Sequence, residues 1–208
     1  KLVSVVMPIY NSSRFLAEAI DSVLAQTFSD IEIICVNDGS DDNSSEILSD
    51  YAARDNRIKI ITQENSGVVA ARNNGVAHAT GQYIYPLDSD DIIAPTALEK
   101  MYLAIIKHRS DIITCRVMQF GKENGELFLL RPTKLNLCRA NCLVNAALIS
   151  RDNFIKTGGY SDDCRIALED YDLWLNCVFA HNMRIYRIPE ILFYYRIKNA
   201  DESRNLQH

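Results

Sequence analysis

The first half of the chain alternates between short apolar runs and segments predicted to be helical. Nearly continuous apolar runs occupy residues 2–8, 31–36, 58–61 and 83–87. Such runs are typical of strands that are buried on both faces of a parallel sheet. Helices are expected between them, at residues 15–24, 44–52 and 67–77. This β-α-β-α-β-α-β order predicts an α/β fold with a Rossmann-like, mostly parallel central sheet flanked by helices.

Two boundaries follow from the same pattern. We expect Pro8 to end the first strand, and Asn11, Ser12 or Ser13 to cap the helix that follows it.

Beyond residue 91 the pattern is weaker, and residues 120–142 are the least periodic. The expected elements are a helix opening at Pro95, strands at residues 111–118 and 145–150, a hairpin turn at 123–126, a helix after Glu169, and two short strands, 185–188 and 191–196, around Pro189.

Three carboxylates, Asp88, Asp90 and Asp91, directly follow the fourth apolar run. Like charges this close repel one another, so the cluster is either a site for a divalent cation and substrate phosphates or an acidic turn before the helix at Pro95. Asp38 follows the second run, and the carboxyl ends of parallel strands meet at one edge of the sheet, where open α/β folds bind ligands. Two acidic strand ends at one edge favour the metal and phosphate site.

Composition narrows the classes of ligand and partner. The 208 residues are 48% hydrophobic with a net charge of −5, which predicts one globular domain without the basic surface that nucleic acids require. The sequence lacks Gly-x-Gly-x-x-Gly and Gly-x-x-x-x-Gly-Lys-Ser/Thr, which disfavours a dinucleotide site and excludes a P-loop. Six cysteines without a Cys-x-x-Cys pair are expected to be reduced thiols of a cytoplasmic protein. The chain starts within an apolar run, so we expect it to be an excerpt of a longer protein.

Five motifs follow one another along the chain: Val-Met-Pro-Ile-Tyr-Asn at 6–11, Val-Asn-Asp-Gly-Ser-Asp-Asp at 36–42, Gly-Val-Val-Ala-Ala-Arg-Asn-Asn-Gly at 67–75, Leu-Asp-Ser-Asp-Asp at 87–91, and Leu-Glu-Asp-Tyr-Asp-Leu-Trp at 168–174. In this order they resemble the family 2 glycosyltransferases of GT-A fold. The resemblance implies a single GT-A domain over residues 1–208. Its nucleotide-sugar-binding half would be 1–91, and its smaller acceptor-side half 92–208.

The resemblance also assigns the donor side of the site. Pro8 and Tyr10 would line the pocket for the nucleotide base, and Asp38 would bind that base, usually uracil. Asp90 would lie near the ribose. Arg72 would face the nucleotide sugar or its phosphates.

The chemistry is implied in the same way. Mn²⁺ or Mg²⁺ would bind at Asp91, with Asp90 and Asp88 completing an Asp-x-Asp cluster. Asp170 would be the general base of an inverting transfer, supported by Glu169.

Each assignment has a purely structural alternative. Arg72 could be a surface ion-pair partner, and Glu169 and Asp170 could be first-turn residues favoured by the helix dipole. Arg196 and Ser203 resemble a Tyr-Arg…Ser pattern that contacts the diphosphate in some relatives, but they could equally form a polar tail.

The predicted activity is sugar transfer from a nucleotide-sugar donor, UDP-linked, to a hydroxyl of a saccharide or lipid-linked saccharide. The family resemblance implies surface polysaccharide or glycoconjugate synthesis in a bacterium, with peripheral association at the inner face of the membrane. Two other classes stay open. One is a non-catalytic nucleotide- or metal-binding module of the same fold, and the other a receiver-like signalling domain with an acidic Mg²⁺ site.

Overall fold

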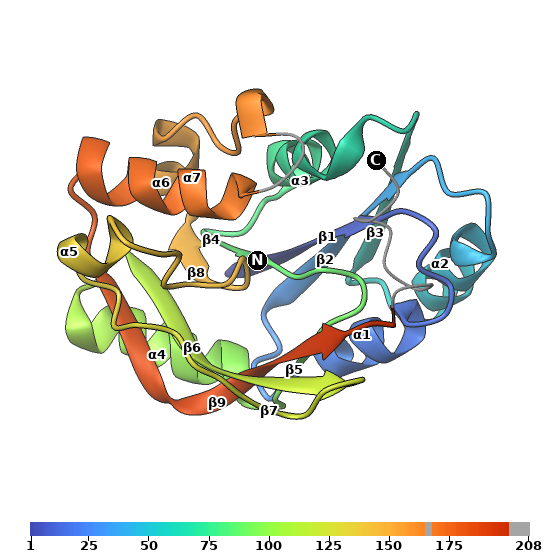
Figure 1. Ribbon diagram of the computed structural model, residues 1–208. Coiled ribbons are helices and arrows are strands. Elements are labelled where there is room, and N and C mark those ends of the chain that lie inside the picture. Colours follow the sequence, from blue (N-terminus) through green and yellow to red (C-terminus); the bar gives the residue numbers. More distant parts are fainter. Residues whose placement is uncertain (165–167, 200–208) are drawn as a thin grey trace.

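The computed structural model describes residues 1–164 and 168–199 and confirms the α/β architecture (Figure 1). Its strands are β1 Val3–Ile9, β2 Ile31–Asp38, β3 Ile58–Gln63, β4 Tyr83–Pro86, β5 Ile92–Ile93, β6 Ile112–Gly121, β7 Gly125–Leu127, β8 Leu148–Ser150 and β9 Ile185–Ile197. Its helices are α1 Leu16–Leu24, α2 Ser44–Arg54, α3 Gly67–His78, α4 Ala97–His108, α5 Lys134–Leu137, α6 Arg151–Lys156 and α7 Glu169–Leu175, with a 3₁₀ turn at Asp162–Cys164 and a π-helical turn at Asn176–Ala180. Within the described residues the strands form one sheet in the order β3-β2-β1-β4-β8-β6-β9-β5, and β7 pairs with β6.

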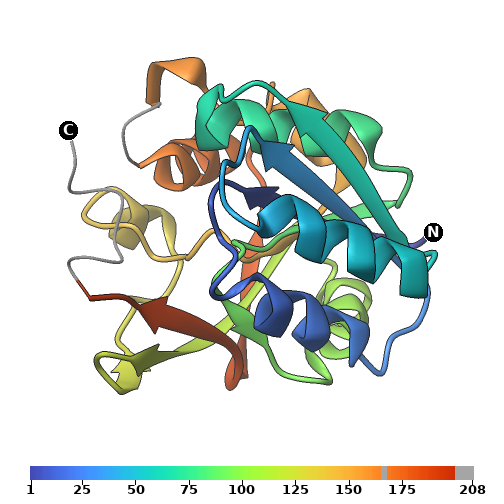
Figure 2. The same ribbon diagram turned by 90° about the vertical axis from the view of Figure 1, so that its right-hand side faces the viewer.

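Helices cover both faces of this sheet. α1, α2 and α4 pack on the face to which Val5 and Met7 of β1 point, whereas α3, α6 and α7 pack on the face of Val6. Figure 1 shows α3, α6 and α7 above the sheet and α1 and α4 below it, and Figure 2 shows α1 and α2 side by side. Successive strand residues point to opposite faces, so the uninterrupted burial of β1 and β2 reflects this double cover.

The parallel half of the sheet places the predicted site. β1 pairs in parallel with β2 and β4, so the carboxyl ends of these strands lie at one edge, as the sequence predicts. Gly75 lets α3 lie close against this half. A Cβ atom there would come within 2.4 Å of Val6 Cγ1 and 3.0 Å of Val36 Cγ2. The close approach of α3 carries Arg72 to the edge where the acidic residues gather.

The other half of the sheet is mixed. β8 is antiparallel to both β4 and β6, β9 is parallel to β6, and β5 is antiparallel to β9. This pairing sets the end of the described chain beside the segment that follows the acidic cluster. The division of the domain at residue 91 stays a prediction.

The prediction of two short strands around Pro189 is wrong, because β9 is continuous. Cys115 lies opposite Ile188, and Arg116 lies opposite Ile191, so the register shifts around Pro189. A bulge of this kind accommodates a residue that cannot donate to the ladder without ending the strand.

Pro8 likewise does not end β1, which continues to Ile9. The carbonyl oxygen of Val6 accepts from Leu87 N at 3.0 Å, and Pro8, two residues further on, faces the same side. Pairing with β4 stops at Val6, so the missing N–H of Pro8 costs no ladder hydrogen bond.

The predicted cap of the first helix is also wrong. α1 begins at Leu16 and has no side-chain cap. The carbonyl oxygen of Ser12 accepts from Phe15 N and Leu16 N, and Asn11 Oδ1 accepts from Asp41 N at 2.8 Å. The polar residues after β1 therefore bind the loop after β2 instead of capping α1.

Three short elements, β5, α5 and α6, were not predicted, since two to six residues are too few to show a period. No helix in the described ranges combines the length and the apolar character needed to cross a bilayer.

Candidate active site

The acidic residues after β4 form a tight turn. Asp91 N donates to the carbonyl oxygen of Asp88 at 3.1 Å, and the three carboxylates differ in exposure. Asp91 is 2% exposed, whereas the Asp88 side chain is 32% exposed. Burial raises the pKa of Asp91 well above its ordinary value, and the neighbouring charges of Asp90 and Asp88 raise it further. The turn therefore gathers three carboxyl groups, of which the buried Asp91 is the hardest to ionise.

Arg72 of α3 lies buried next to this turn and binds two carboxylates. Its Nη2 donates to Asp88 Oδ1 at 2.7 Å, and its Nη1 donates to Glu169 Oε1 at 2.5 Å. Burial alone lowers the pKa of Arg72, but the charges of Asp88, Tyr160 and Glu169 outweigh burial and raise it. A surface ion pair is thus the wrong description of Arg72, because only 3% of the residue is exposed.

The loop before α7 supports the Arg72 side chain. The guanidinium lies 5.3 Å from the centre of the Tyr160 ring, a cation–π arrangement. Asn73 fixes this loop, since its Nδ2 donates to Tyr160 O at 2.8 Å and its Oδ1 accepts from Tyr160 N at 3.0 Å. α3 therefore sets the position of Arg72 and of the ring against which it packs.

α7 presents the predicted base. Leu168, which precedes the helix, has a left-handed φ of 68° although it is not a glycine. Such backbone strain is concentrated at functional sites. Asp170 follows in the first turn, where burial raises its pKa to about 6 and the charge of Glu169 adds to the rise. Asn141 Nδ2 donates to Asp170 Oδ2 at 3.3 Å and opposes that rise.

The predicted base pocket lies at the ends of β1 and β2. Asp38 is 3% exposed, and its carboxylate accepts from Gln63 Nε2 at 2.8 Å, Ser66 N at 2.8 Å and Gly67 N at 2.9 Å. Asp38 therefore also closes the N-terminus of α3. Pro8 is buried within β1, and Tyr10, 39% exposed, is the more accessible of the two residues expected to line the pocket.

Arg196 reaches the acidic turn from β9. Its backbone N donates to Asp91 Oδ1 at 2.8 Å, and its Nε donates to Asp90 O at 2.7 Å. Its guanidinium pairs with Glu18 and lies 4.5 Å and 4.3 Å from the ring centres of Phe15 and Phe120. The polar-tail interpretation of Arg196 is wrong, because this side chain joins α1, β6 and the acidic turn. Ser203 lies outside the described residues.

The donor set at the turn suits a hard divalent cation. Carboxylate oxygens are the ligands that Mn²⁺ and Mg²⁺ prefer. The pKa of Asp91 is raised by burial and then by the charges of Asp90 and Asp88, and a bound cation would offset both effects. In the described part of the chain, no three His, Cys, Asp or Glu side chains gather closely enough to hold a metal by themselves. A cation would therefore need further ligands, such as the phosphates of a substrate.

Three residues that sequence reasoning missed complete the site: Asn141, Tyr195 and Lys198. Lys198 forms an ion pair with Asp90. Burial raises the pKa of Tyr195 to about 12, and charges of the acidic turn and of Asp170 add to it. No sequence motif marks these residues, because strand pairing and loop packing bring them to the site.

The architecture is that of the GT-A fold, which solved structures of TarS from S. aureus share. The structure of TarS 1-349 in complex with UDP matches with a TM-score of 0.80 and 20% identity, over 95% of this chain and 61% of that chain. The complex with UDP-GlcNAc gives 0.81 and 19%, over 96% and 60%. Identity this low establishes the fold alone.

Sequence comparison identifies the family. Residues 4–172 match the family described as Glycosyl transferase family 2. The uncharacterized glycosyltransferase MJ1057 of Methanocaldococcus jannaschii is 34% identical over 96% of this chain and 72% of its own length. Glycosyltransferase GlyG of Streptococcus pneumoniae is 39% identical over 62% and 43%, and the uncharacterized glycosyltransferase EpsJ of Bacillus subtilis is 46% identical over 66% and 39%. The chain therefore belongs to glycosyl transferase family 2. This family membership excludes a receiver-like signalling domain. The chain matches less than half the length of GlyG and of EpsJ.

Proposed function

We propose that the chain is the catalytic domain of an inverting glycosyltransferase. It takes a sugar from a nucleotide-sugar donor, UDP-linked, and transfers it to a hydroxyl of a saccharide or lipid-linked saccharide. The proposed setting is synthesis of a bacterial surface polysaccharide or glycoconjugate, as the family resemblance implies.

One observation carries this proposal: Arg72 joins the acidic turn to the helix that bears Asp170. The Arg72 bonds to Asp88 and Glu169 join the acidic turn, the proposed site for a cation and the diphosphate, to the helix whose Asp170 carboxylate has a pKa of about 6. A general base works best when its pKa lies near the working pH. A carboxylate raised to this range beside a donor site suits the removal of a proton from an acceptor hydroxyl.

The donor is proposed to lie across the ends of β1, β2 and β4. The base would occupy the region of Tyr10 and Asp38, and the diphosphate would reach the acidic turn, where Arg196 and Lys198 supply positive charge. The TarS complexes with UDP and UDP-GlcNAc support UDP as the nucleotide, since that protein shares the fold.

The proposed transfer is a single displacement. Asp170 accepts the proton of the acceptor hydroxyl as its oxygen attacks the anomeric carbon on the side opposite the diphosphate, so the configuration inverts. Such a base typically contributes roughly 10²–10⁴ to the rate. Asn141 holds this carboxylate and lowers its pKa, whereas the charge of Glu169 raises that pKa. No covalent glycosyl-enzyme forms, so no nucleophile is needed.

Asp91 is the proposed principal ligand of Mn²⁺ or Mg²⁺, with Asp90 or Asp88 as the second. When bound, such a cation stabilises the charge that develops on the diphosphate leaving group. Asp88 also bonds Arg72, so a shift of this carboxylate toward the cation would be felt at Glu169.

A two-stage experiment tests the proposal. Nucleotide sugars are first screened for the rise in unfolding temperature that a bound ligand produces, with and without Mn²⁺. The stabilising donor is then incubated with saccharide acceptors while UDP release and the anomeric configuration of the product are measured. Acceptor-dependent UDP release with inversion is expected. Binding without turnover across the acceptor panel would favour the non-catalytic module, and absence of nucleotide binding would refute both.

A further inference from the structure

The segment that runs from the end of β7 through α5 exposes apolar side chains that a globular surface normally buries. Phe128 is 85% exposed, Leu135 is 63% exposed and Leu130 is 36% exposed. Single exposed apolar residues need no explanation, but three within eight positions, one of them a phenylalanine almost fully in water, mark an interaction surface.

The same segment is positively charged in a chain whose net charge is −5. Arg131, Lys134 and Arg139 are exposed, and no Asp or Glu occurs between Glu126 and Asp152. Glu126 itself is engaged by Arg116. In the part of the chain that the structure describes, no carboxylate forms a salt bridge with Arg131 or Arg139. The positive charge of the segment is therefore available to an anionic partner.

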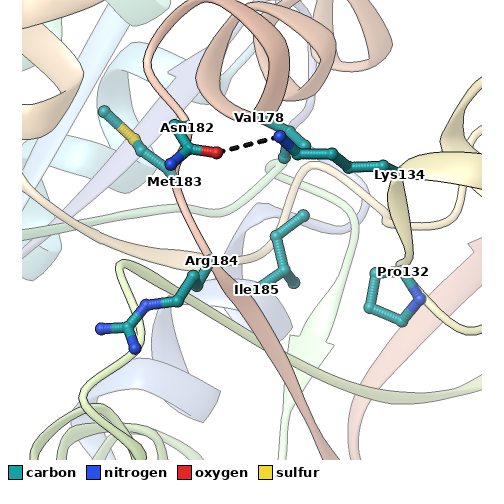
Figure 3. Close-up of a pocket in the computed structure, with 7 residues that line it drawn as sticks. All are labelled: Pro132, Lys134, Val178, Asn182, Met183, Arg184 and Ile185. Atoms are coloured by element: carbon teal, nitrogen blue, oxygen red, sulfur yellow. Dashed lines mark hydrogen bonds between the residues drawn. The ribbon is translucent and has the colours of Figure 1, made fainter.

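A cavity of about 470 Å³ adjoins this segment (Figure 3). Lys134 and Arg184 line it together with the apolar side chains of Pro132, Val178, Met183 and Ile185, and the guanidinium of Arg184 turns away toward Arg109 O and Asp111. Asn182 Oδ1 accepts from Lys134 Nζ at 2.9 Å and holds the ammonium group at the cavity. A Lys134 ammonium group beside apolar side chains suits a phosphate that is attached to an apolar stem.

The inner side of the segment is firmly fixed. Arg187 of β9 donates to Leu129 O and Leu130 O, both at 2.8 Å, and also to Cys142 O. Tyr171 of α7 donates to the carbonyl oxygen of Leu137. The exposed apolar residues are therefore presented on an ordered surface, which lowers the entropic cost of docking.

We propose that residues 128–139, together with this cavity, dock the protein on a bilayer that contains anionic phospholipid. Apolar side chains insert at the interface, while the basic side chains bind the phosphates, a combination that produces peripheral binding. Asn141 and Tyr171 connect this segment to α7, so the docked surface borders the side of Asp170. The consequence that a lipid-linked acceptor would be presented to Asp170 rests on the proposed function.

Vesicle sedimentation tests the surface. The 208-residue chain is mixed with vesicles of phosphatidylcholine alone or with phosphatidylglycerol. We expect binding to the anionic vesicles only, weakening as salt is added. Phe128→Ser with Leu135→Ser should weaken binding by about tenfold or more. Arg131→Gln with Lys134→Gln should weaken it by about fivefold for each charge removed.

Matched control variants lie on other surfaces. Leu103→Ser with Ile106→Ser removes two α4 side chains that are each 57% exposed, and Lys107→Gln with Lys156→Gln removes two exposed charges. Both pairs should bind vesicles like the unmodified chain. Equal loss in the controls, equal binding to neutral vesicles, or no binding at low salt would overturn the proposal.

A second copy of the chain is the competing occupant of this surface. A concentration-dependent dimer in light scattering that Phe128→Ser with Leu135→Ser abolishes would assign the surface to that copy and overturn membrane docking.

Vesicle binding is measured without donor or turnover, so its outcome is independent of the proposed transfer. The docking variants should keep wild-type transfer to a water-soluble acceptor.

Discussion

Arg72 and Glu169 are 97 positions apart in the sequence, yet Arg72 Nη1 and Glu169 Oε1 lie 2.5 Å apart. The other Nη of the same guanidinium reaches Asp88 at 2.7 Å. The guanidinium is fixed by both carboxylates and packs on the Tyr160 ring. One buried side chain therefore joins the acidic turn to the residue that precedes the proposed base.

Loss of Arg72 should affect stability and donor binding together. Arg72→Gln leaves Asp88 and Glu169 without their cation, and breaking a buried pair in this way typically costs about 3 kcal/mol. Urea unfolding measures the stability loss, and calorimetry with UDP measures donor affinity. Arg72→Lys keeps the charge but not the two-armed geometry, so it should recover part of the stability. Unchanged stability with lost UDP affinity would make Arg72 solely a ligand residue.

Asp170→Asn separates chemistry from binding. The amide keeps the shape of the side chain but cannot take a proton, so turnover should fall by roughly 10²–10⁴ while binding of UDP and Mn²⁺ is retained. Asp172→Asn is the matched control, because Asp172 also lies in the first turn of α7. If Asp170 only supported the helix end, the variant would lose about 1 kcal/mol of stability and remain active. Melting temperature and turnover, measured on both variants, decide between these accounts.

The pH dependence of turnover should report Asp170. A protonated carboxyl cannot accept a proton, and the Asp170 pKa of about 6 lies above the ordinary 3.8. The kcat should therefore be level above pH 6 and fall by about tenfold for each pH unit below it.

Two variants should shift the pH at which kcat begins to fall, the acid limb of the profile, in opposite directions. Asn141→Ala removes a hydrogen bond that lowers the Asp170 pKa, so the limb should move to higher pH. Glu169→Gln removes a charge that raises it, so the limb should move to lower pH. Shifts in the same direction, or none, would point to another titrating group.

Asp91→Asn tests the metal site. The asparagine retains an acceptor for the backbone N of Arg196 but removes the charge that burial and its neighbours disfavour, so stability without metal should hold or rise. Transfer and the Mn²⁺-dependent rise in unfolding temperature should be lost. Full activity of the variant, or of the unmodified chain in excess EDTA, would rule out the metal.

Asp38→Ala should weaken UDP binding whichever sugar is attached, and without acceptor present. Because Asp38 also accepts from Ser66 N and Gly67 N, the variant should lose about 1 kcal/mol of stability as well. Gln63→Ala is the control, since it removes a single bond to Asp38 and leaves the carboxylate in place. Wild-type UDP affinity in calorimetry would leave Asp38 as a structural residue only.

The sequence by itself determined the parallel half of the fold and the edge at which the site lies. A continuous apolar run is buried along its whole length only in a strand that is covered on both faces. The polar residues that follow such a run must then lie at the carboxyl end of that strand. Asp38 and the residues from Asp88 to Asp91 could therefore be assigned to one edge from local pattern alone. The family motifs added Arg72, Glu169 and Asp170, because those residues occur in recognisable local order.

Only the tertiary structure decided how these residues interact. The Arg72 bridge to Glu169, the approach of Arg196 and Lys198 to the acidic turn, and the contact of Asn141 with Asp170 all join distant segments. The raised pKa of Asp170 also depends on burial by these segments. Local patterns carry no signal for such contacts. They arise because β9 pairs with β5 and because α3 and α7 are joined through Arg72 and Glu169. The continuity of β9 through Pro189 has the same origin, because pairing along the whole of β6 outweighs the local tendency of proline to end a strand.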